Sequence, residues 1–307
     1  MTDQLRVLFC ADPMNRRRPD PLYESEFAAA QDVGITYDLI DFESLVYDGD
    51  ASRAVRSVLT ASRPTIGIYR GWMLRPGQYA TLYAALESRG VQLLNDPEAY
   101  ALCHHLPNWY PALREWTPAS SWLQTDLNVP SEQIASLLRP FRGAPVIVKD
   151  FVKSQKHHWH EACFIPSSAD RVNAERIVRR FLELQGPDLN EGLVFREFEQ
   201  FVPLTAHSRS GMPLTREYRL FFLDSEPILT AEYWDEGDYD AQAPPLDQFR
   251  SIASLVGSRF FTMDVAMRTD GQWRVVELGD GQVAGLPDRA DLPAFYRAVA
   301  RCLAKSI

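Results

Sequence analysis

The first hundred residues alternate between short apolar runs and longer amphipathic segments, and this pattern restricts the possible folds most strongly. Short apolar runs are typical of buried strands, whereas apolar residues at i, i+3 and i+4 are typical of half-buried helices. Strands alternating with helices indicate a mainly parallel sheet, so this part is predicted to be an α/β domain with helices on both faces. The predicted strands are residues 6–11, 37–42, 65–69 and 91–94, and the predicted helices are 20–32, 51–59 and 79–86.

Capping residues support these boundaries. Asp20 followed by Pro21 is typical of a helix start, and Gly90 is typical of a helix end. A segment rich in proline and tryptophan follows at residues 106–118, and it is predicted to be the exit from the first domain.

The second half has a different pattern, in which strands are predicted to pair antiparallel. An α+β unit is therefore predicted to follow the α/β domain, with a binding cleft between the two. The predicted strands are 144–151, 163–166, 193–201, 217–223 and 228–234, the predicted helices are 170–184, 246–256 and 292–305, and a hairpin is predicted at 260–278.

The hairpin contains two acidic residues that its turn is predicted to place opposite each other. Asp270 and Gly271 favour a two-residue type I′ loop. Counting back along both strands from this loop places Asp264 opposite Glu277, with Cβ atoms about 4.5–5.5 Å apart. Facing carboxylates are tolerated if both are solvated, if one is protonated, or if a cation lies between them. An exposed hairpin face and a Mg²⁺ site are both compatible with this pair.

Charge and composition limit the classes of function. The chain has 307 residues and a formal net charge of −9, which disfavours general nucleic-acid binding. No apolar stretch is long enough to span a bilayer, and the N-terminal sequence does not resemble a signal peptide. The four cysteines form neither a CxxC metal site nor a disulfide framework. A cytoplasmic protein with reduced thiols is expected.

Three further strands carry charged residues in an order that is informative. Lys149 lies within the run Pro145–Asp150, and Lys153 follows it. Glu197 and Glu199 lie on one face at the end of residues 193–199, and Arg219 lies within residues 216–223. Followed by Asp264 and Glu277, this order resembles the ATP-grasp superfamily, in particular a clade of stand-alone ATP-grasp proteins. Residues 69–74 and 95–100 are similar to stretches in the first domain of that clade.

The resemblance implies an α/β pre-ATP-grasp domain, residues 1–112, followed by an ATP-grasp domain, residues 113–307, whose α+β subdomains have mainly antiparallel sheets. A smaller subdomain at about 117–203 and a metal-binding subdomain at about 204–307 grip the nucleotide between them. ATP and Mg²⁺ are the implied cofactors. By position, Lys149, Lys153 and Arg219 match residues that bind and stabilise the phosphates, Glu197 or Glu199 matches the ribose ligand, and Asp264 and Glu277 match the magnesium ligands.

The sequence departs from the family at two places. The family often has an asparagine two residues after the second acid, where this chain has Gly279, and the neighbouring Asp280 is a candidate to supply the missing oxygen. The loop over the phosphates is often rich in glycine, whereas residues 154–161 contain His157, His158 and His160. A lid over substrate or phosphate and a zinc site are the alternatives for these histidines.

The resemblance also implies a reaction. Ligases of this superfamily activate a carboxylate as an acyl phosphate, release ADP, and let an amine or a thiol attack. The partners are then ATP, an amino-acid, peptide or other small carboxylate, and an amine acceptor, with a homodimer left open. A phosphotransferase and a non-catalytic nucleotide sensor are the alternative functions. Arginines in the loops after the first and third strands are candidates to hold the substrate carboxylate: Arg16, Arg18, Arg70 and Arg75.

Overall fold

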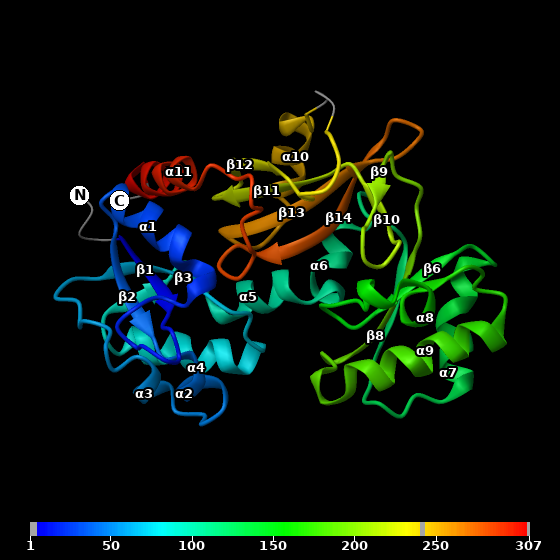
Figure 1. Cartoon of the computed structure of the whole chain (residues 1–307), viewed down its shortest axis with the longest axis horizontal. Helices are drawn as coiled ribbons and strands as arrows, with labels where there is room; N and C mark the ends of the chain where they lie inside the picture. The colour runs from blue at the N-terminus through cyan, green and yellow to red at the C-terminus, as the bar shows by residue number, and fades with distance from the viewer. Residues whose placement is uncertain (1–4, 240–242, 306–307) are drawn as a thin grey trace.

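The computed structural model describes residues 5–239 and 243–305. The first domain contains a parallel sheet of order β2-β1-β3-β4, as the alternating pattern predicts. Helices cover both faces of this sheet (Figure 1). Its elements are β1 (Leu5–Cys10), α1 (Glu24–Asp32), β2 (Thr36–Ile40), α2 (Phe42–Val46), α3 (Ala51–Ala54), β3 (Thr65–Arg70), α4 (Pro76–Glu87), β4 (Val91–Leu93) and α5 (Pro97–His104).

One predicted helix in this part has the wrong end, and one helix was not predicted. The helix expected at 51–59 ends at Ala54, although Val55 and Val58 are still buried by the turns that follow. The segment after His105 is a helix, α6 (Leu106–Leu113), which contains Pro111 and buries Trp109. This helix forms despite its prolines because its apolar face packs into the core of the second half of the chain.

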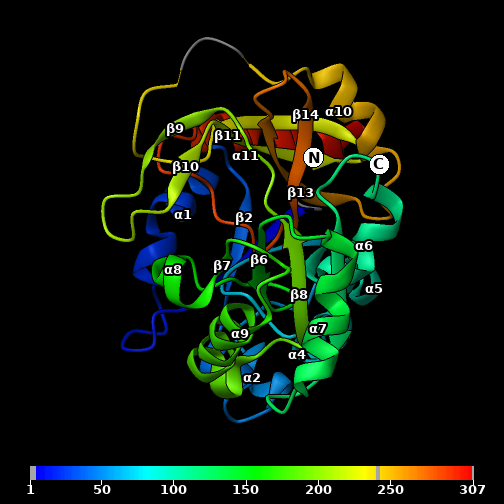
Figure 2. The same cartoon turned by 90° about the vertical axis from the view of Figure 1, so that its right-hand side faces the viewer.

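The second half contains two four-stranded antiparallel sheets. One has the order β5-β8-β6-β7 and is covered by α7 and α9; the other has the order β12-β11-β13-β14 and lies between α10 and the first domain (Figures 1 and 2). The elements of the first unit are β5 (Ser120–Gln124), α7 (Ser131–Leu138), β6 (Val146–Lys149), α8 (Trp159–Ala162), β7 (Phe164–Ile165), α9 (Arg171–Gln185) and β8 (Gly192–Glu197). The remaining elements are β9 (Pro203–Ala206), β10 (Pro213–Thr215), β11 (Glu217–Leu223), β12 (Glu226–Glu232), α10 (Leu246–Ala253), β13 (Phe260–Met267), β14 (Trp273–Asp280) and α11 (Leu292–Lys305).

The last helix returns to the first domain. Helix α11 packs beside α1, and the core that they share also contains Phe221 of β11 and Phe260 of β13. The C-terminal helix therefore joins the first sheet to the last one, and both ends of the described chain lie close together (Figure 1). None of the helices in the described residues is long and apolar enough to cross a membrane.

The β13–β14 hairpin has the predicted pairing at its acids but not the predicted turn. Arg268 and Gln272 close the loop through an N–H···O bond of 2.7 Å, which leaves three loop residues instead of two. Of these, Gly271 has a φ of +87° whereas Asp270 is not in the left-handed region, so the loop is not of type I′. A β-bulge beside Asp264 then shifts the register by one residue and restores the pairing of Asp264 with Glu277.

Candidate functional site

Three charged side chains lie side by side on adjacent strands of the β12-β11-β13-β14 sheet. Arg219 of β11 pairs in register with Asp264 of β13, and Asp264 pairs with Glu277 of β14. Side chains at directly paired positions point to the same face of a sheet. The opposite face carries the apolar side chains of the core, such as Leu220 and Met263. One polar face with an arginine and two carboxylates in a row follows from this alternation.

The central carboxylate is held by the arginine. Asp264 is 4% exposed and accepts two hydrogen bonds of 2.7 Å from Nε and Nη2 of Arg219. Arg219 also donates to the carbonyl oxygen of Gly285 over 2.9 Å, and its guanidinium lies 4.7 Å from the ring centre of Tyr233. Burial opposes the charge of Arg219, but the carboxylate of Asp264 outweighs it and raises the pKa of the guanidinium. The arginine is therefore a permanent cation in the site.

Two lysines from the facing subdomain place positive charge near the second carboxylate, Glu277. Lys149, at the end of β6 and 4% exposed, forms an ion pair with Glu277. Lys156, from the loop that follows, has its Nζ 5.6 Å and 5.4 Å from the ring centres of Tyr233 and Trp234. Burial disfavours the charge of Glu277, but Lys149 and Lys156 outweigh this effect and lower its pKa. Cations from one sheet and acids from the other thus meet across the boundary between the subdomains.

Lys156 was not among the residues predicted from the sequence. Tyr233 and then the nearby carboxylates raise its pKa, so it is charged at neutral pH. The signal that pointed to it was weak, because a lysine in a loop is ordinarily a solvated surface residue. The neighbouring Lys153, which was predicted, is exposed and lines a different cavity.

A further acid lies on the same face. Glu217, two residues before Arg219 on β11, is 6% exposed. Burial, and then the negative charge of Asp264, raise the pKa of Glu217 to about 8. Glu217 is therefore largely protonated at neutral pH, which lowers the repulsion within the acidic row.

Asp280 does not complete a metal site with these acids. By alternation it lies on the opposite face of β14 from Glu277. Its two oxygens accept hydrogen bonds from Nδ2 of Asn95 (2.5 Å) and from the backbone N–H of Gln282 (2.9 Å). Asp280 borders the same cavity as Asp264 and Glu277, but it is one residue out of phase with their face and its carboxylate is bonded to Asn95 and Gln282, so the structure does not support the expectation that it supplies the third oxygen.

The histidine loop provides no zinc site either. Among the described residues, no group of three or more His, Cys, Asp and Glu side chains is placed to hold a metal ion. A metal at Asp264 and Glu277 would have no third His, Cys, Asp or Glu ligand among the described residues, and water and nucleotide phosphates would supply oxygens to it, as they commonly do for Mg²⁺. Two facing carboxylates with oxygen-only donors fit that ion.

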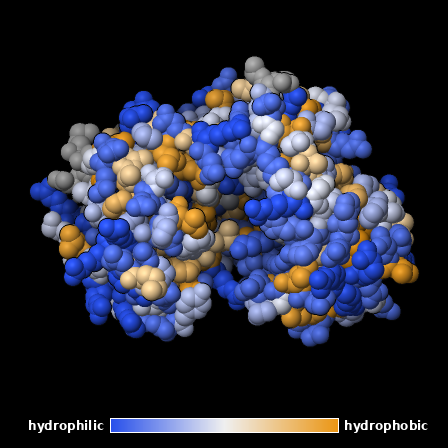
Figure 3. Space-filling view, in the orientation of Figure 1, coloured by the Kyte–Doolittle hydropathy of each residue, from blue (hydrophilic) through white to orange (hydrophobic). Residues whose placement is uncertain are grey.

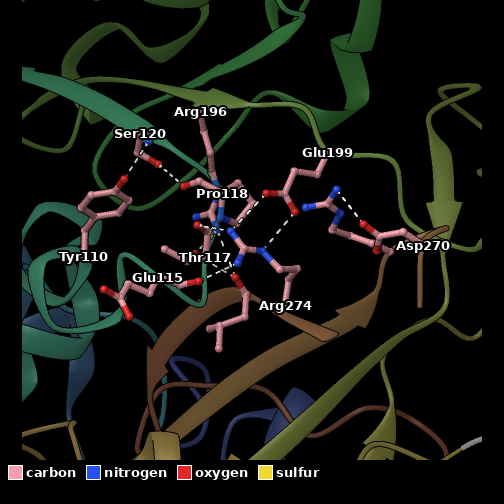
Figure 4. Close-up of polar contacts among 11 residues, drawn as sticks. Tyr110, Glu115, Thr117, Pro118, Ser120, Arg196, Glu199, Asp270 and Arg274 are labelled. Atoms are coloured by element: carbon pink, nitrogen blue, oxygen red, sulfur yellow. Dashed lines mark hydrogen bonds and ion pairs between the residues drawn. The ribbon is translucent and has the colours of Figure 1, made fainter. Parts of the chain in front are cut away.

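The predicted ribose ligands lie at the junction of the two subdomains. Glu199 is occupied, because its oxygens accept hydrogen bonds of 3.2 Å from Nε and Nη2 of Arg274 (Figure 4). Arg274 also donates to the carbonyl oxygens of Glu115 (2.7 Å) and Thr117 (2.6 Å). Glu199 thus fastens the end of one subdomain to β14 of the other, and Glu197 is the candidate of the two that remains accessible.

Two neighbouring cavities adjoin this site. The smaller, about 200 Å³, is lined by Arg219, Asp264, Glu277 and Tyr233. The larger, about 870 Å³, lies between the first domain and the subdomain that contains α9. Figure 3 shows a hollow at this position between the two lobes of the molecule. Both cavities share Met73 and His104 in their lining, so a ligand in the larger one can extend toward the row of charges.

Of the arginines predicted to hold a substrate, only Arg75 lines the larger cavity. The prediction for Arg70 is wrong: it is 1% exposed and donates two hydrogen bonds to Glu26 and one each to the carbonyl oxygens of Gly281 and Ala284. Arg16 forms ion pairs with Asp41 and Glu43, and neither it nor Arg18 lines these two cavities. Sequence position alone could not separate a buried arginine from one that faces a cavity.

Comparison with known proteins identifies the family. Residues 141–299, which include Lys149, Arg219, Asp264 and Glu277, match the model of an ATP-grasp domain family, the third family of its clade. The chain belongs to this ATP-grasp family. The cofactors of ATP-grasp proteins, ATP and Mg²⁺, are those expected from the sequence. No curated protein matches the chain.

Solved structures of ATP-grasp proteins share the whole architecture. The ATP-grasp ligase PsnB complexed with minimal precursor, Mg and ADP has a TM-score of 0.58 at 16% identity, with 97% of this chain and 98% of that chain covered. The D-cycloserine synthetase DcsG has a TM-score of 0.58 at 16% identity, with 97% and 99% covered. The D-alanyl-alanine synthetase A of Vibrio cholerae has a TM-score of 0.56 at 13% identity, with 99% and 98% covered. The fold is thus an α/β domain followed by ATP-grasp subdomains, as predicted.

Proposed function

We propose that this protein is an ATP-dependent ligase that joins a carboxylate to an amine or a thiol through an acyl phosphate and releases ADP. The observation that carries the proposal is the row of Arg219, Asp264 and Glu277, met by Lys149 and Lys156 from the facing subdomain. Phosphoryl transfer needs positioned positive charge around the transferring group more than it needs a protein nucleophile. The ATP-grasp ligase PsnB and the D-cycloserine synthetase DcsG share this fold, and their activities support the same reaction class.

The reaction would proceed in two balanced steps. An oxygen of the substrate carboxylate attacks the γ-phosphorus of ATP, and the bond to the β-phosphate oxygen breaks to release ADP. The amine or thiol then attacks the acyl carbon, inorganic phosphate leaves, and the nucleophile loses its proton. A Mg²⁺ ion held by Asp264 and Glu277 would offset charge on the phosphates. Arg219, Lys149 and Lys156 would hold the transferring group by charge-assisted hydrogen bonds.

The substrate carboxylate is proposed to enter through the larger cavity. One side of its lining is apolar and aromatic, with Phe42, Tyr47 and Trp72, while the other side carries Lys153 and Asn190. A volume of about 870 Å³ exceeds what a single amino acid fills and favours a peptide or an extended small molecule. PsnB, which shares this fold, has been solved in complex with a precursor peptide, which agrees with a substrate of this size. Arg75 is the candidate to hold a second anionic group of such a substrate.

The test is nucleotide product analysis. Purified protein is incubated with ATP, Mg²⁺ and pools of amino acids, peptides and polyamines, and the products are identified by mass spectrometry. ADP, inorganic phosphate and a condensed product are expected. AMP with pyrophosphate would contradict the acyl-phosphate route, and a stable phosphorylated product without an amine would indicate a phosphotransferase.

A matched pair of variants ties the reaction to the site. Glu277→Gln should lower ADP release by about a hundredfold or more, because removing a group that stabilises transition-state charge typically costs this much. Glu226→Gln, on the exposed side of β12, is the control and should leave the rate unchanged. Normal turnover by Glu277→Gln would remove this residue from the site.

A further inference from the structure

Thr262 has a buried hydroxyl that the site described so far does not use. It lies on β13 two residues before Asp264, so its side chain points to the same face of the sheet. Thr262 is 1% exposed and lines the smaller cavity together with Asp264 and Glu277. The only hydrogen bond that its hydroxyl makes among the described residues is a long one of 3.4 Å to the carbonyl oxygen of Gly279. A buried hydroxyl with so weak a partner has capacity to bind another group.

The position of this hydroxyl explains why the chain has a glycine at 279. Gly279 pairs in register with Thr262, beside the pair of Asp264 and Glu277. A Cβ atom at position 279 would lie 2.8 Å from Oγ1 of Thr262, which is closer than side chains approach each other. The threonine side chain thus occupies the space that a side chain at 279 would need, so an asparagine there would require Thr262 to move.

We propose that Thr262 supplies the oxygen that the missing asparagine would supply, so that Asp264, Glu277 and Thr262 together form the protein's part of the Mg²⁺ site. This inference rests on the proposed nucleotide site. The three oxygens come from one face of two paired strands, which is a rigid support. A neutral hydroxyl is a suitable ligand because Mg²⁺ accepts oxygen donors of either charge and is often held by few protein groups.

The experiment measures metal affinity directly, without turnover. Mn²⁺ replaces Mg²⁺, and its binding to the protein saturated with a non-hydrolysable ATP analogue is followed by electron paramagnetic resonance. Thr262→Val keeps the shape of the side chain and replaces the hydroxyl by a methyl group, so the Kd for Mn²⁺ should rise about tenfold or more. Thr262→Ser keeps the hydroxyl and should bind within about threefold of the original protein. Thr230→Val, on the exposed edge strand β12 of the same sheet, is the matched control.

A second pair of variants tests the exchange of positions. Thr262→Ala should weaken Mn²⁺ binding, and the double variant Thr262→Ala with Gly279→Asn should recover much of the loss, because removing the threonine side chain frees the space beside residue 279. Unchanged affinity in Thr262→Val, equal weakening in Thr262→Val and Thr262→Ser, or no recovery in the double variant would each overturn the proposal.

The measurements of Mn²⁺ binding can be interpreted independently of the test of the proposed reaction. If no substrate pool produces ADP but Thr262→Val still weakens Mn²⁺ binding, the ligase proposal fails and the metal site stands. If the enzyme is an active ligase and Thr262→Val binds Mn²⁺ normally, the metal proposal alone is wrong.

Discussion

At the scale of single residues, the site balances carboxylates against cations from two subdomains. Arg219 lies on the same sheet as Asp264, whereas Lys149 pairs with Glu277 from the facing subdomain and Lys156 of that subdomain lowers the pKa of Glu277 through its charge. Phosphate oxygens can compete for these cations, because a triphosphate offers several negatively charged acceptors at once. The lysines are therefore the residues whose contacts we expect to change most when nucleotide binds.

The two loop lysines should have different effects on kinetics. Lys156 lies beside the row of acids, so Lys156→Met should raise the KM for ATP about tenfold through the loss of a charge-assisted contact. Lys153 lines the larger cavity, so Lys153→Met should raise the KM for the carboxylate substrate and leave that for ATP nearly constant. Steady-state kinetics with each substrate varied in turn separates the two. The same change in both constants for both variants would contradict this assignment.

Glu217 should make stability depend on pH in an unusual direction. Its pKa is raised from 4.5 to about 8 in the folded protein, so folding favours the protonated form. Its contribution to stability is complete below pH 4.5 and is lost as the pH rises to about 8. Glu217→Gln stays neutral throughout, so its free energy of unfolding relative to the original protein should increase from about pH 5 to about pH 9. Urea unfolding at both values measures this difference, and Glu226→Gln, at an exposed site, should show no such trend.

At the scale of elements, the β13–β14 hairpin combines two irregularities that cancel. Its loop has one residue more than the two-residue turn that Asp270 and Gly271 indicate. The bulge beside Asp264 compensates for this extra residue, so Asp264 still pairs with Glu277. The predicted pairing was therefore correct although the predicted turn was not. A two-residue loop with both residues in the left-handed region does occur, at Asp224 and Ser225 between β11 and β12.

The bonds around Arg274 should hold the two ATP-grasp subdomains together. Arg274→Ala removes the partner of Glu199, whose side chain is 9% exposed, and leaves two carbonyl oxygens without their donor (Figure 4). We expect the free energy of unfolding to fall by about 2 to 3 kcal/mol. Arg250→Ala, in an exposed ion pair on α10, is the control and should cost less than about 1 kcal/mol. Urea denaturation measures the free energy of unfolding of both variants. Equal losses would show that the bonds of Arg274 do not hold the two subdomains together.

At the scale of the whole molecule, the first domain is joined to the end of β14 by buried hydrogen bonds. Asn95 bonds to Phe260 through both its amide nitrogen (2.6 Å) and its oxygen (3.0 Å), and it donates to Asp280. Arg70 donates to the carbonyl oxygens of Gly281 and Ala284, and Gln282 donates to the hydroxyl of Tyr79 over 2.6 Å. The segment just after Glu277 is thus buried against the first sheet. The subdomain with β5-β8-β6-β7 makes no comparable set of buried bonds with the first domain in the described residues.

Asn95→Ala should therefore destabilise the protein as a whole. It leaves the backbone N–H and carbonyl oxygen of Phe260 without their side-chain partner and one oxygen of the buried Asp280 carboxylate without its donor, so the free energy of unfolding should fall by about 3 kcal/mol. Asn108→Ala removes a single exposed bond to a carbonyl oxygen and should cost no more than about 1 kcal/mol. Thermal and urea unfolding measure both. A loss for Asn95→Ala no greater than for Asn108→Ala would show that this junction contributes little.

The sequence by itself determined the layout of the chain and the chemistry of its site. Alternating strand and helix patterns were sufficient for the parallel first sheet, because the period of apolar residues follows from local backbone geometry. The order of Lys149, Arg219, Asp264 and Glu277 predicted the ATP-grasp family, and the family model that matches residues 141–299 confirms that membership. These features depend on positions within one strand or one turn.

Only the tertiary structure decided which charged residues belong to the site. Asp280 is one position from the face that carries Glu277. Arg70 is buried among partners from three segments, and Glu199 is bonded to Arg274. Lys156 could be assigned to the site only from the structure, because the loop that carries it folds over the aromatic side chains of another sheet. Each outcome depends on contacts between residues far apart in the sequence, and burial or pairing at that distance has no local signature.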